Sequence, residues 1–167
     1  MPTRNQAAKL PSIGLSIWSS GFLAGETITR KLRRAMVLAD YAPRHVVTKG
    51  SFRVAFSDSS DADEVTSVGG VFPQVDKEGK LFTVTALEDM EYYCVVPDGK
   101  NNLVYETFQV AKAHTVPQGK LAFVFGESYT VNEKLRQGVS VLACVNSAVS
   151  IQADKTCTVV EFSVGIP

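Results

Sequence analysis

Two histidines, His45 and His114, are the first residues to consider for catalysis, because imidazole can act as an acid, a base or a metal ligand near neutral pH. They lie 69 positions apart, and the chain contains no other histidine. A metal site built on three histidines is therefore impossible within one chain. A Cys–His pair that uses His114 stays open, since contacts between distant positions cannot be read from the sequence.

A carboxylate cluster at Glu88, Asp89 and Glu91 could support acid–base chemistry, since neighbouring carboxylates shift each other's pKa. On a strand, Asp89 and Glu91 would share one face and Glu88 would point to the other. Met90 and Tyr92 would then supply the buried face. Carboxylates of this kind mostly lie on protein surfaces, so we expect a solvated strand edge or turn here and not an active site.

Two further patterns fall short of a known site. The acidic loop 58–64 has Ser60 and Ala62 at ligand positions of a calcium loop and lacks its glycine, which predicts an exposed charged loop. Ser128 follows Gly126, but the second glycine of a nucleophile elbow is missing. No phosphate-binding glycine motif occurs either. The sequence thus predicts no catalytic residue, no metal ligand and no cofactor, and we expect a protein that is not an enzyme.

Three cysteines, Cys94, Cys144 and Cys157, form an odd set with irregular spacing and no Cys-x-x-Cys pair. This favours free thiols and synthesis in a cytoplasm. Each cysteine has apolar neighbours, which predicts small buried core residues. No apolar run is long enough to span a membrane, and the N-terminus lacks the apolar core of a signal peptide, so we expect no membrane association.

Charge is distributed unevenly along the chain. Its 17 basic residues balance 17 acidic ones, but residues 1–53 hold nine basic and two acidic side chains. The densest basic run, Arg30, Lys31, Arg33 and Arg34, predicts contact with an acidic protein surface or a polyanion. Pairing with the protein's own acidic region is the open alternative. A dedicated nucleic-acid binder is not expected, because the pI is near 6.7 and no aromatic residues alternate with these cations.

One helix and a series of strands are predicted to position these residues. Between positions 26 and 40, apolar residues recur at three- and four-residue spacing, which predicts a helix with Ile28, Leu32, Ala35, Met36 and Ala39 on one face. Segments rich in Val, Phe, Tyr and Thr predict strands over 13–18, 46–48, 52–56, 81–87, 92–96, 103–110, 121–125, 139–146 and 157–164. Turn residues lie at 97–102, 117–120 and 132–134. Short strands without crossover helices predict an antiparallel sandwich or barrel.

The stretch from Val116 to Gly138 has the order glycine, apolar strand, glycine, polar strand, turn, glycine. This order resembles the central part of a cupin-like double-stranded β-helix, and the resemblance extends over about residues 80–164. Enzymes of that family hold a metal with a His-x-His pair, a carboxylate and a further histidine. No histidine stands between Glu88 and Tyr93, where the first ligands would fall. The resemblance therefore implies the scaffold without its metal chemistry, a form used for binding or assembly.

The layout of the whole chain also resembles small structural proteins of tailed bacteriophages, which combine a polar N-terminal arm, a short helix and a compact β-domain. We therefore expect a mainly β fold, an antiparallel jelly-roll or cupin-like barrel over residues 46–167, preceded by an arm and one short basic helix over residues 1–45. The expected function is that of a non-enzymatic virion protein: capsid decoration or cement, neck or tail-fibre component. It would be made in the host cytoplasm and would assemble with other virion proteins and with copies of itself.

Residues 1–45 are expected to supply the docking contacts, with the basic and acidic parts of the chain as two unlike ends. The contacts would be apolar side chains near the N-terminus that a C-terminal core does not need, together with the basic run: Ile13, Leu15, Ile17, Trp18, Phe22, Leu23, Arg30, Lys31, Arg33 and Arg34. The alternative function is a metal-free cupin-type module that binds a carbohydrate through Tyr92, Tyr93, Tyr105 or Tyr129.

Overall fold

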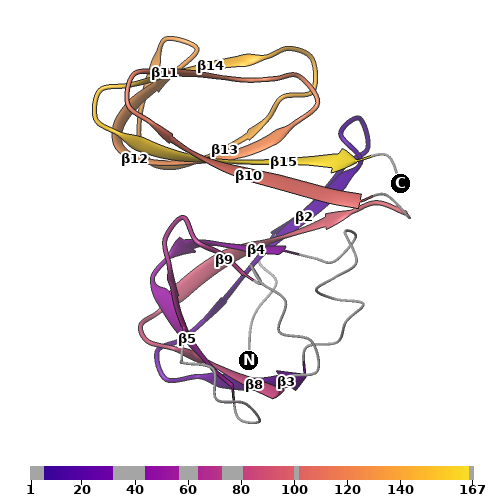
Figure 1. Cartoon of the computed structure of the whole chain (residues 1–167), viewed down its shortest axis with the longest axis vertical. Coiled ribbons are helices and arrows are strands. Elements are labelled where there is room, and N and C mark those ends of the chain that lie inside the picture. The colour runs from indigo at the N-terminus through magenta and orange to yellow at the C-terminus, as the bar shows by residue number, and fades with distance from the viewer. Residues whose placement is uncertain (1–5, 32–43, 57–63, 73–80, 100–101, 166–167) are drawn as a thin grey trace.

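A computed structural model describes residues 6–31, 44–56, 64–72, 81–99 and 102–165, and over these ranges the chain forms strands and turns without a helix. Two β-rich halves are stacked along the long axis of the molecule (Figure 1). The lower half contains the described residues from 6 to 99, and the upper half contains residues 102–165. In the described ranges no helix is long and apolar enough to cross a membrane.

The lower half consists of two antiparallel sheets. One has five strands in the order β1-β2-β9-β4-β7, and the other has four in the order β3-β8-β5-β6. Their bounds are β1 Gln6–Leu10, β2 Leu15–Phe22, β3 Thr27–Lys31, β4 Arg44–Lys49, β5 Ser51–Phe56, β6 Glu64–Ser67, β7 Val71–Phe72, β8 Leu81–Ala86 and β9 Met90–Pro97.

The upper half is a single antiparallel sheet of six strands that curls on itself. Its path is β10-β15-β12-β14-β11, and β13 pairs with β12 off this path. The bounds are β10 Asn102–Val110, β11 Ala113–Val116, β12 Leu121–Val131, β13 Lys134–Ala143, β14 Val149–Ala153 and β15 Cys157–Gly165. The long strand β12 makes the curl, because its first part pairs with β15 and its last part with β14.

Three apolar cores lie one above the other. One fills the lower half between its two sheets and includes Phe52, Phe82 and Met90. A second fills the inside of the upper half and includes Val124, Tyr129, and Val159. The third lies between the halves, where side chains from β2, β4 and β9 pack against side chains from β12 and β15. The halves are thus joined by a continuous apolar contact, which strongly favours their folding together.

Successive side chains of a strand point to opposite faces, and this explains how one sheet contributes residues to two cores. On β12, Phe123 faces the core between the halves and Val124 faces the inside of the upper half, and both are fully buried. On β4, Val46 and Val47 divide in the same way between two cores. A strand covered on both faces needs apolar residues at successive positions, which is why residues 121–125 form an unbroken apolar run.

The β12–β13 turn is tight. Asn132 and Glu133 have φ angles of 46° and 71°, so a two-residue turn with both central residues in the left-handed region connects the strands. This confirms the turn predicted at 132–134. Asparagine tolerates that region, whereas glutamate is uncommon there.

Each of the nine segments predicted as strands overlaps an observed strand, and all the pairings among the described strands are antiparallel, so the prediction of antiparallel β-structure is confirmed. The predicted helix is wrong over its described part, because residues Thr27–Lys31 form β3 and pair with β8. Apolar spacing of three and four positions arose there by chance, and pairing with a neighbouring strand decided the conformation. The rest of that prediction, including Leu32, Arg33, Arg34, Ala35, Met36 and Ala39, lies outside the described residues, as does loop 57–63.

Part of the segment expected as an N-terminal appendage lies inside the lower half. β2 pairs with β9 along its full length, and β1 pairs with the other edge of β2. Leu15 is fully buried, and Ile13 is 3% exposed in the core between the halves. We expected that the β-core does not need these apolar side chains, and this expectation is wrong. Strand pairing places β2 in the centre of the molecule, where Leu15 is part of the core.

Candidate functional site

The inside of the upper half contains a charged cluster, made of Glu161, His114 and Lys120. Glu161 lies on β15 between Val160 and Phe162, with its side chain on the same face as Val159, which points into the upper core. It is 2% exposed, and Lys120 Nζ lies 3.2 Å from its Oε1 atom. His114 on β11 contacts the other carboxylate oxygen, Oε2, through Nε2.

The strand pairing explains how three distant positions meet. β15 lies next to β12 on one side of the upper half, while β11 joins the same sheet at its far end through β14. Because the sheet curls, the side chain of His114 reaches back across the inside to β15. Lys120 comes from the turn that leads from β11 into β12. The buried carboxylate of Glu161 therefore links β15, next to one end of the curled sheet, to β11 at the other end.

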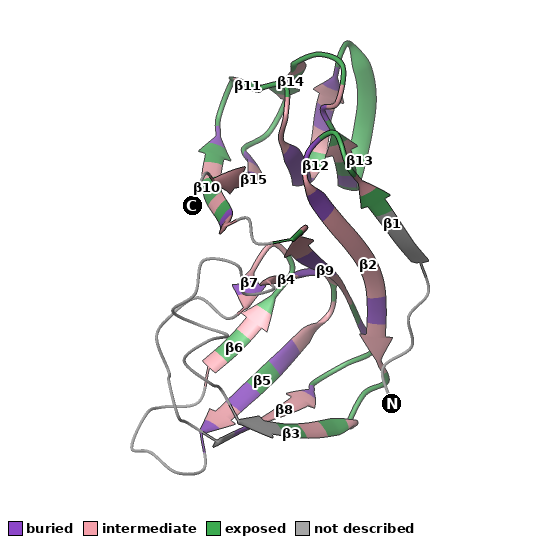
Figure 2. Cartoon of the chain, turned by 90° about the vertical axis from the view of Figure 1, so that its right-hand side faces the viewer, coloured by how far each residue is buried: buried purple, intermediate pink, exposed green. Residues whose placement is uncertain are grey.

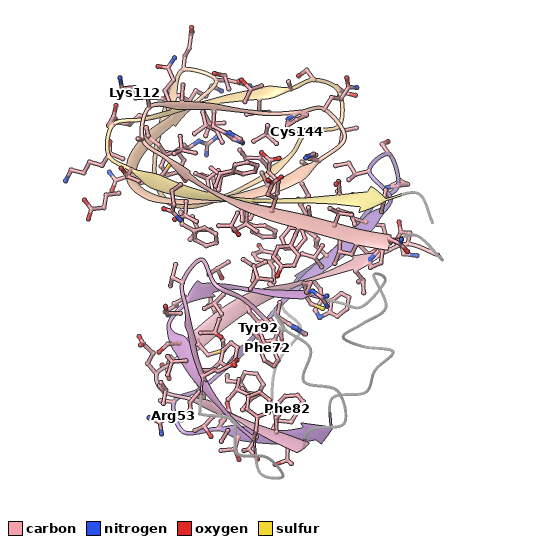
Figure 3. The ribbon with its side chains drawn as sticks, viewed as in Figure 1. Arg53, Phe72, Phe82, Tyr92, Lys112 and Cys144 are labelled. Atoms are coloured by element: carbon pink, nitrogen blue, oxygen red, sulfur yellow. The ribbon has the colours of Figure 1, made fainter. Side chains whose placement is uncertain are left out.

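Aromatic and sulfur groups surround this cluster. The ring of Phe108 lies 4.6 Å from the ring of His114, centroid to centroid. Burial, and then the negative charge of Glu161, raise the pKa of the Cys144 thiol. Burial likewise raises the pKa of Cys157. Both thiols are held protonated at neutral pH and are poor nucleophiles, so the Cys–His option gains no support from them. Figure 3 shows Cys144 inside the ring of upper strands.

The predicted role of the cysteines is confirmed, since Cys94, Cys144 and Cys157 are all free and buried.

A second polar contact fills the same interior. Tyr129 is fully buried, and its hydroxyl lies 2.6 Å from Ser140 Oγ and donates to the Gly138 carbonyl at 3.2 Å. Burial raises the pKa of this phenol, so it stays neutral. In the described part of the chain, every buried side-chain nitrogen or oxygen has a hydrogen-bond partner. The polar groups inside the upper half therefore satisfy one another.

Metal binding has no basis in the geometry of the described residues, where no three His, Cys, Asp or Glu side chains are close enough to share an ion. Glu161 has its two oxygens occupied by a histidine and a lysine. A lysine ammonium donates hydrogen bonds but cannot ligate a metal in its charged form. The cluster is suited to holding strands β11 and β15 together inside the barrel.

His45 occupies a different environment in the lower half. Its Nδ1 atom lies 3.2 Å from the Phe72 carbonyl, and its ring meets the ring of Tyr92 edge-on at 5.4 Å. Burial is the largest effect on this group and lowers its pKa, although the Phe72 carbonyl opposes the shift. Figure 3 shows Phe72 and Tyr92 pointing into this half. The sequence could not show whether His45 and His114 lie close together, and in the structure they do not form one site.

The carboxylates Glu88, Asp89 and Glu91 lie at the exposed turn between β8 and β9 and at the start of β9. Glu88 accepts a hydrogen bond from Ser51 Oγ at 3.0 Å, and Asp89 accepts one from the Ala24 backbone at 2.9 Å. The prediction of a solvated turn is confirmed, and these carboxylates brace neighbouring loops.

The residues expected as docking contacts do not form one surface. Ile13 is buried, and Ile17 and Phe22 pack against two different cores. Trp18 is half-buried on β2, whereas Leu23 is 65% exposed. Among the basic positions, Arg30 and Lys31 belong to β3, and Arg33 and Arg34 lie outside the described residues.

The charge imbalance along the chain does not make two separate ends among the described residues. Lys49 on β4 and Glu91 on β9 are direct strand partners, although they come from the basic and the acidic stretch. Residues 102–165 hold five basic and five acidic side chains. Strands from both stretches are therefore interleaved in the lower half, and the upper half is neutral.

Of the four tyrosines named for a sugar-binding module, one is fully buried and three are half-buried and packed against other aromatic rings. Tyr129 is fully buried. Tyr92 stacks on Phe22, Tyr93 packs against Phe123, and Tyr105 packs against Phe162. The structure presents none of the four as an open platform for a sugar ring.

One surface feature was missed at the level of the sequence. β13 is ten residues long, yet eight of its positions are exposed, and Leu135, Val139 and Val141 are among them. Figure 2 shows this strand as a long, mostly green ribbon at the side of the upper half. The predicted strand over 139–146 covered only the second part of β13 and gave no indication that its apolar side chains would be exposed.

Comparison with known proteins defines the class of fold. No family model matches the chain, and no curated protein matches its sequence. Among solved structures, a cupin 2 conserved barrel domain protein from Leptotrichia buccalis is similar over 99% of this chain and 92% of its own, at 12% identity and a TM-score of 0.52. HutD from Pseudomonas fluorescens is similar over 92% of this chain and 80% of its own, at 11% identity and a TM-score of 0.53.

YhhW from Escherichia coli is similar over 92% of this chain and 82% of its own, at 11% identity and a TM-score of 0.50. Identities this low show the fold alone. The chain is thus a mainly β protein with a cupin-like barrel fold, and its described residues show no metal-binding group.

Proposed function

We propose that this protein is a non-enzymatic structural protein that acts through assembly, with copies of itself and with other proteins. The observation that carries the proposal is the long exposed strand β13, with apolar side chains on its surface. An exposed apolar edge strand is a template for pairing with another chain, and proteins that stay monomeric usually cover or charge such an edge. The charged residues of β13, Lys134 and Arg136, lie at its beginning, and residues 137–143 carry no charge.

The inside of the upper half supports the same proposal. In cupin-like barrels this interior is the natural place for chemistry, yet here Glu161, His114 and Lys120 bind one another and apolar side chains fill the rest. A site that must act on a substrate keeps reactive groups free to meet it. These groups act instead as a structural tie.

The setting that we propose is the virion of a tailed bacteriophage, where the protein would decorate or cement the capsid or form part of the neck or a tail fibre. A virion holds many copies of one small subunit at high local concentration, which suits a protein that associates through a single exposed strand. Its partners there would be other virion proteins and further copies of itself.

Mass spectrometry of purified virions from a strain that carries the gene tests this proposal. We expect the protein in the particles at a fixed ratio to the major capsid protein, retained after repeated density-gradient purification. Its presence in cell lysate together with its absence from pure particles would contradict the virion setting.

Carbohydrate binding remains the alternative function, and a glycan array distinguishes the two. Reproducible binding of one sugar class by the purified protein would favour the binding module. We expect no binding, because the four tyrosines available for stacking are packed against other side chains.

A further inference from the structure

β13 is an edge strand of the six-stranded sheet. One of its sides pairs with β12 over nine residue pairs from Leu121–Ala143 to Val131–Lys134. Among the described strands, none pairs with its other side. A strand of ten residues at about 3.3 Å per residue offers a row of backbone donors and acceptors up to about 33 Å long, which bends at Gly138, where φ is 76°.

The side chains on this edge are unusually apolar for a surface. Eight large apolar side chains are exposed among the described residues, and three of them lie on β13: Leu135 at 65%, Val139 at 37% and Val141 at 37%. All three stand at odd positions, so they share one face of the strand. Val139 and Val141 are the strand partners of Phe125 and Phe123, which belong to the core between the halves. The exposed apolar row therefore continues a buried one.

The charges on β13 favour antiparallel over parallel pairing with the β13 strand of a second copy. The charged residues of β13 are Lys134 and Arg136, both basic and both at its beginning. Parallel pairing in register would place Lys134 beside Lys134, and like charges directly opposite destabilise a sheet. Antiparallel pairing centred on Ser140 places Lys134 beyond the end of the partner's strand and sets Val139 opposite Val141 twice.

We propose that two copies of this protein pair through β13 in an antiparallel arrangement about a two-fold axis near Ser140. The two six-stranded sheets then form one continuous sheet, with Val139 of each copy opposite Val141 of the other. This inference rests on the proposed function and names one partner for it. A single strand pair is a small interface, so we expect dimerisation in the micromolar range of concentration.

Sedimentation equilibrium of the full chain and of three variants tests the proposal. Val139→Lys and Val141→Lys place a cation on the edge, as natural edge strands do, and should each leave a monomer at concentrations where the unchanged protein is a dimer. Val104→Lys is the matched control: Val104 is 50% exposed on β10, an edge strand of the same sheet, and this variant should dimerise normally.

A wild-type chain that stays monomeric at every concentration would overturn the inference. So would a dimer that survives both β13 substitutions, or one that is lost equally in Val104→Lys. Far-UV circular dichroism checks that each variant is folded.

A cross-linking measurement does not depend on the lysine variants. The double variant Val139→Cys, Val141→Cys should form covalent dimers under mild oxidation, because facing Cβ atoms on antiparallel strands come within about 5.5 Å. The unchanged protein should form none, since its three cysteines are buried. Absence of cross-linked dimer in the double variant contradicts this register.

The two proposals can fail separately. If the protein is found in purified virions but does not dimerise through β13, assembly stands and the partner is another protein. If it dimerises through β13 but is missing from virions, the inference stands and the virion setting is wrong.

Discussion

The two halves of this molecule each contain one histidine, and they treat it in opposite ways. In the upper half, His114 contacts the carboxylate of Glu161, which is almost completely buried and also binds Lys120. In the lower half, His45 contacts the Phe72 carbonyl and the ring of Tyr92. The upper interior contains a histidine in contact with a buried carboxylate, whereas the lower interior lowers the pKa of its histidine by burial.

The difference shows that the interiors of the two halves are stabilised by different kinds of interaction. Aromatic packing in the lower half brings together Phe52, Phe72 and Phe82 at ring distances of 5.7 and 5.8 Å. In the upper half, the buried side chain of Glu161 contacts His114 and Lys120 and so links β15 to the end strand β11. A buried charge is costly without partners, so the upper half depends on its cluster being complete.

Removal of both side chains that contact Glu161 should have the largest effect. The double variant His114→Leu, Lys120→Met leaves Glu161 buried without a partner, which we expect to lower the free energy of unfolding by about 3–5 kcal/mol. Urea denaturation measures it. Adding Glu161→Leu to the same chain should restore most of the loss, because no charge is then left buried.

The exposed pair Lys155–Glu127 is the matched control for that experiment. Its two atoms are 2.9 Å apart, but the side chains are 69% and 78% exposed. Lys155→Met should leave the urea midpoint unchanged. If the double variant were as stable as this control, the charged cluster would not be what closes the upper half.

Truncation at the contact between the halves should come next in size. Leu15→Ala removes a fully buried side chain from the core that both halves share, and we expect a loss of about 3 kcal/mol. The thermal transition should shift as a whole, because both halves lose the same contact. Leu23→Ala, at a side chain that is 65% exposed, is the control and should leave stability unchanged. Two separated transitions in Leu15→Ala would mean that the halves fold independently.

Protonation of His45 should make the free energy of unfolding depend on pH. The pKa of His45 is lowered in the folded state, mainly by burial, so below about pH 6.5 the unfolded chain binds a proton that the folded chain does not. Above pH 6.5, His45 is neutral in both states and does not lower the free energy of unfolding. As the pH drops from 6.5 towards the folded pKa, the free energy of unfolding falls by at most about 1.4 kcal/mol per pH unit. His45→Gln should flatten this slope in urea titrations between pH 6.5 and 5. An unchanged slope would show that burial does not control this histidine.

The smallest expected effect is at the β12–β13 turn. Glu133 has a φ of 71°, which favours glycine, so Glu133→Gly should raise the free energy of unfolding by less than about 1 kcal/mol. Thermal unfolding measures the change, and Asn132→Gly is the control with a smaller effect, since asparagine already tolerates this conformation. A destabilised Glu133→Gly variant would mean that the flexibility of the unfolded chain outweighs the strain at the turn.

Much of the fold could be predicted from short-range patterns. Alternation and β-branched residues marked nine strands, and the turn residues around Asn132 marked a reversal that the structure confirms. The error over residues 27–31 has a clear origin: this segment contains a single apolar residue, so the helical spacing depended on residues after it, and pairing with β8 decided its conformation.

The candidate sites were less accessible to prediction. Glu161 carried a signal, because a lone carboxylate within the apolar run 157–164 must find a partner if the strand is buried. The partner could not be identified, since His114 is 47 positions away and meets Glu161 only through the curl of the sheet. The same holds for the edge position of β13, which depends on where β14 and β15 pair with β12.

By itself, the sequence determined the class of secondary structure, the positions of most strands, and the burial of the three cysteines, because these depend on local composition and alternation. Only the tertiary structure decided which strands became neighbours. It brought the N-terminal strands into the core, interleaved the basic and acidic stretches, enclosed Glu161 with His114 and Lys120, and left β13 at an edge. The physical reason is that pairing between distant strands sets burial, and burial sets what each charged or apolar side chain can do.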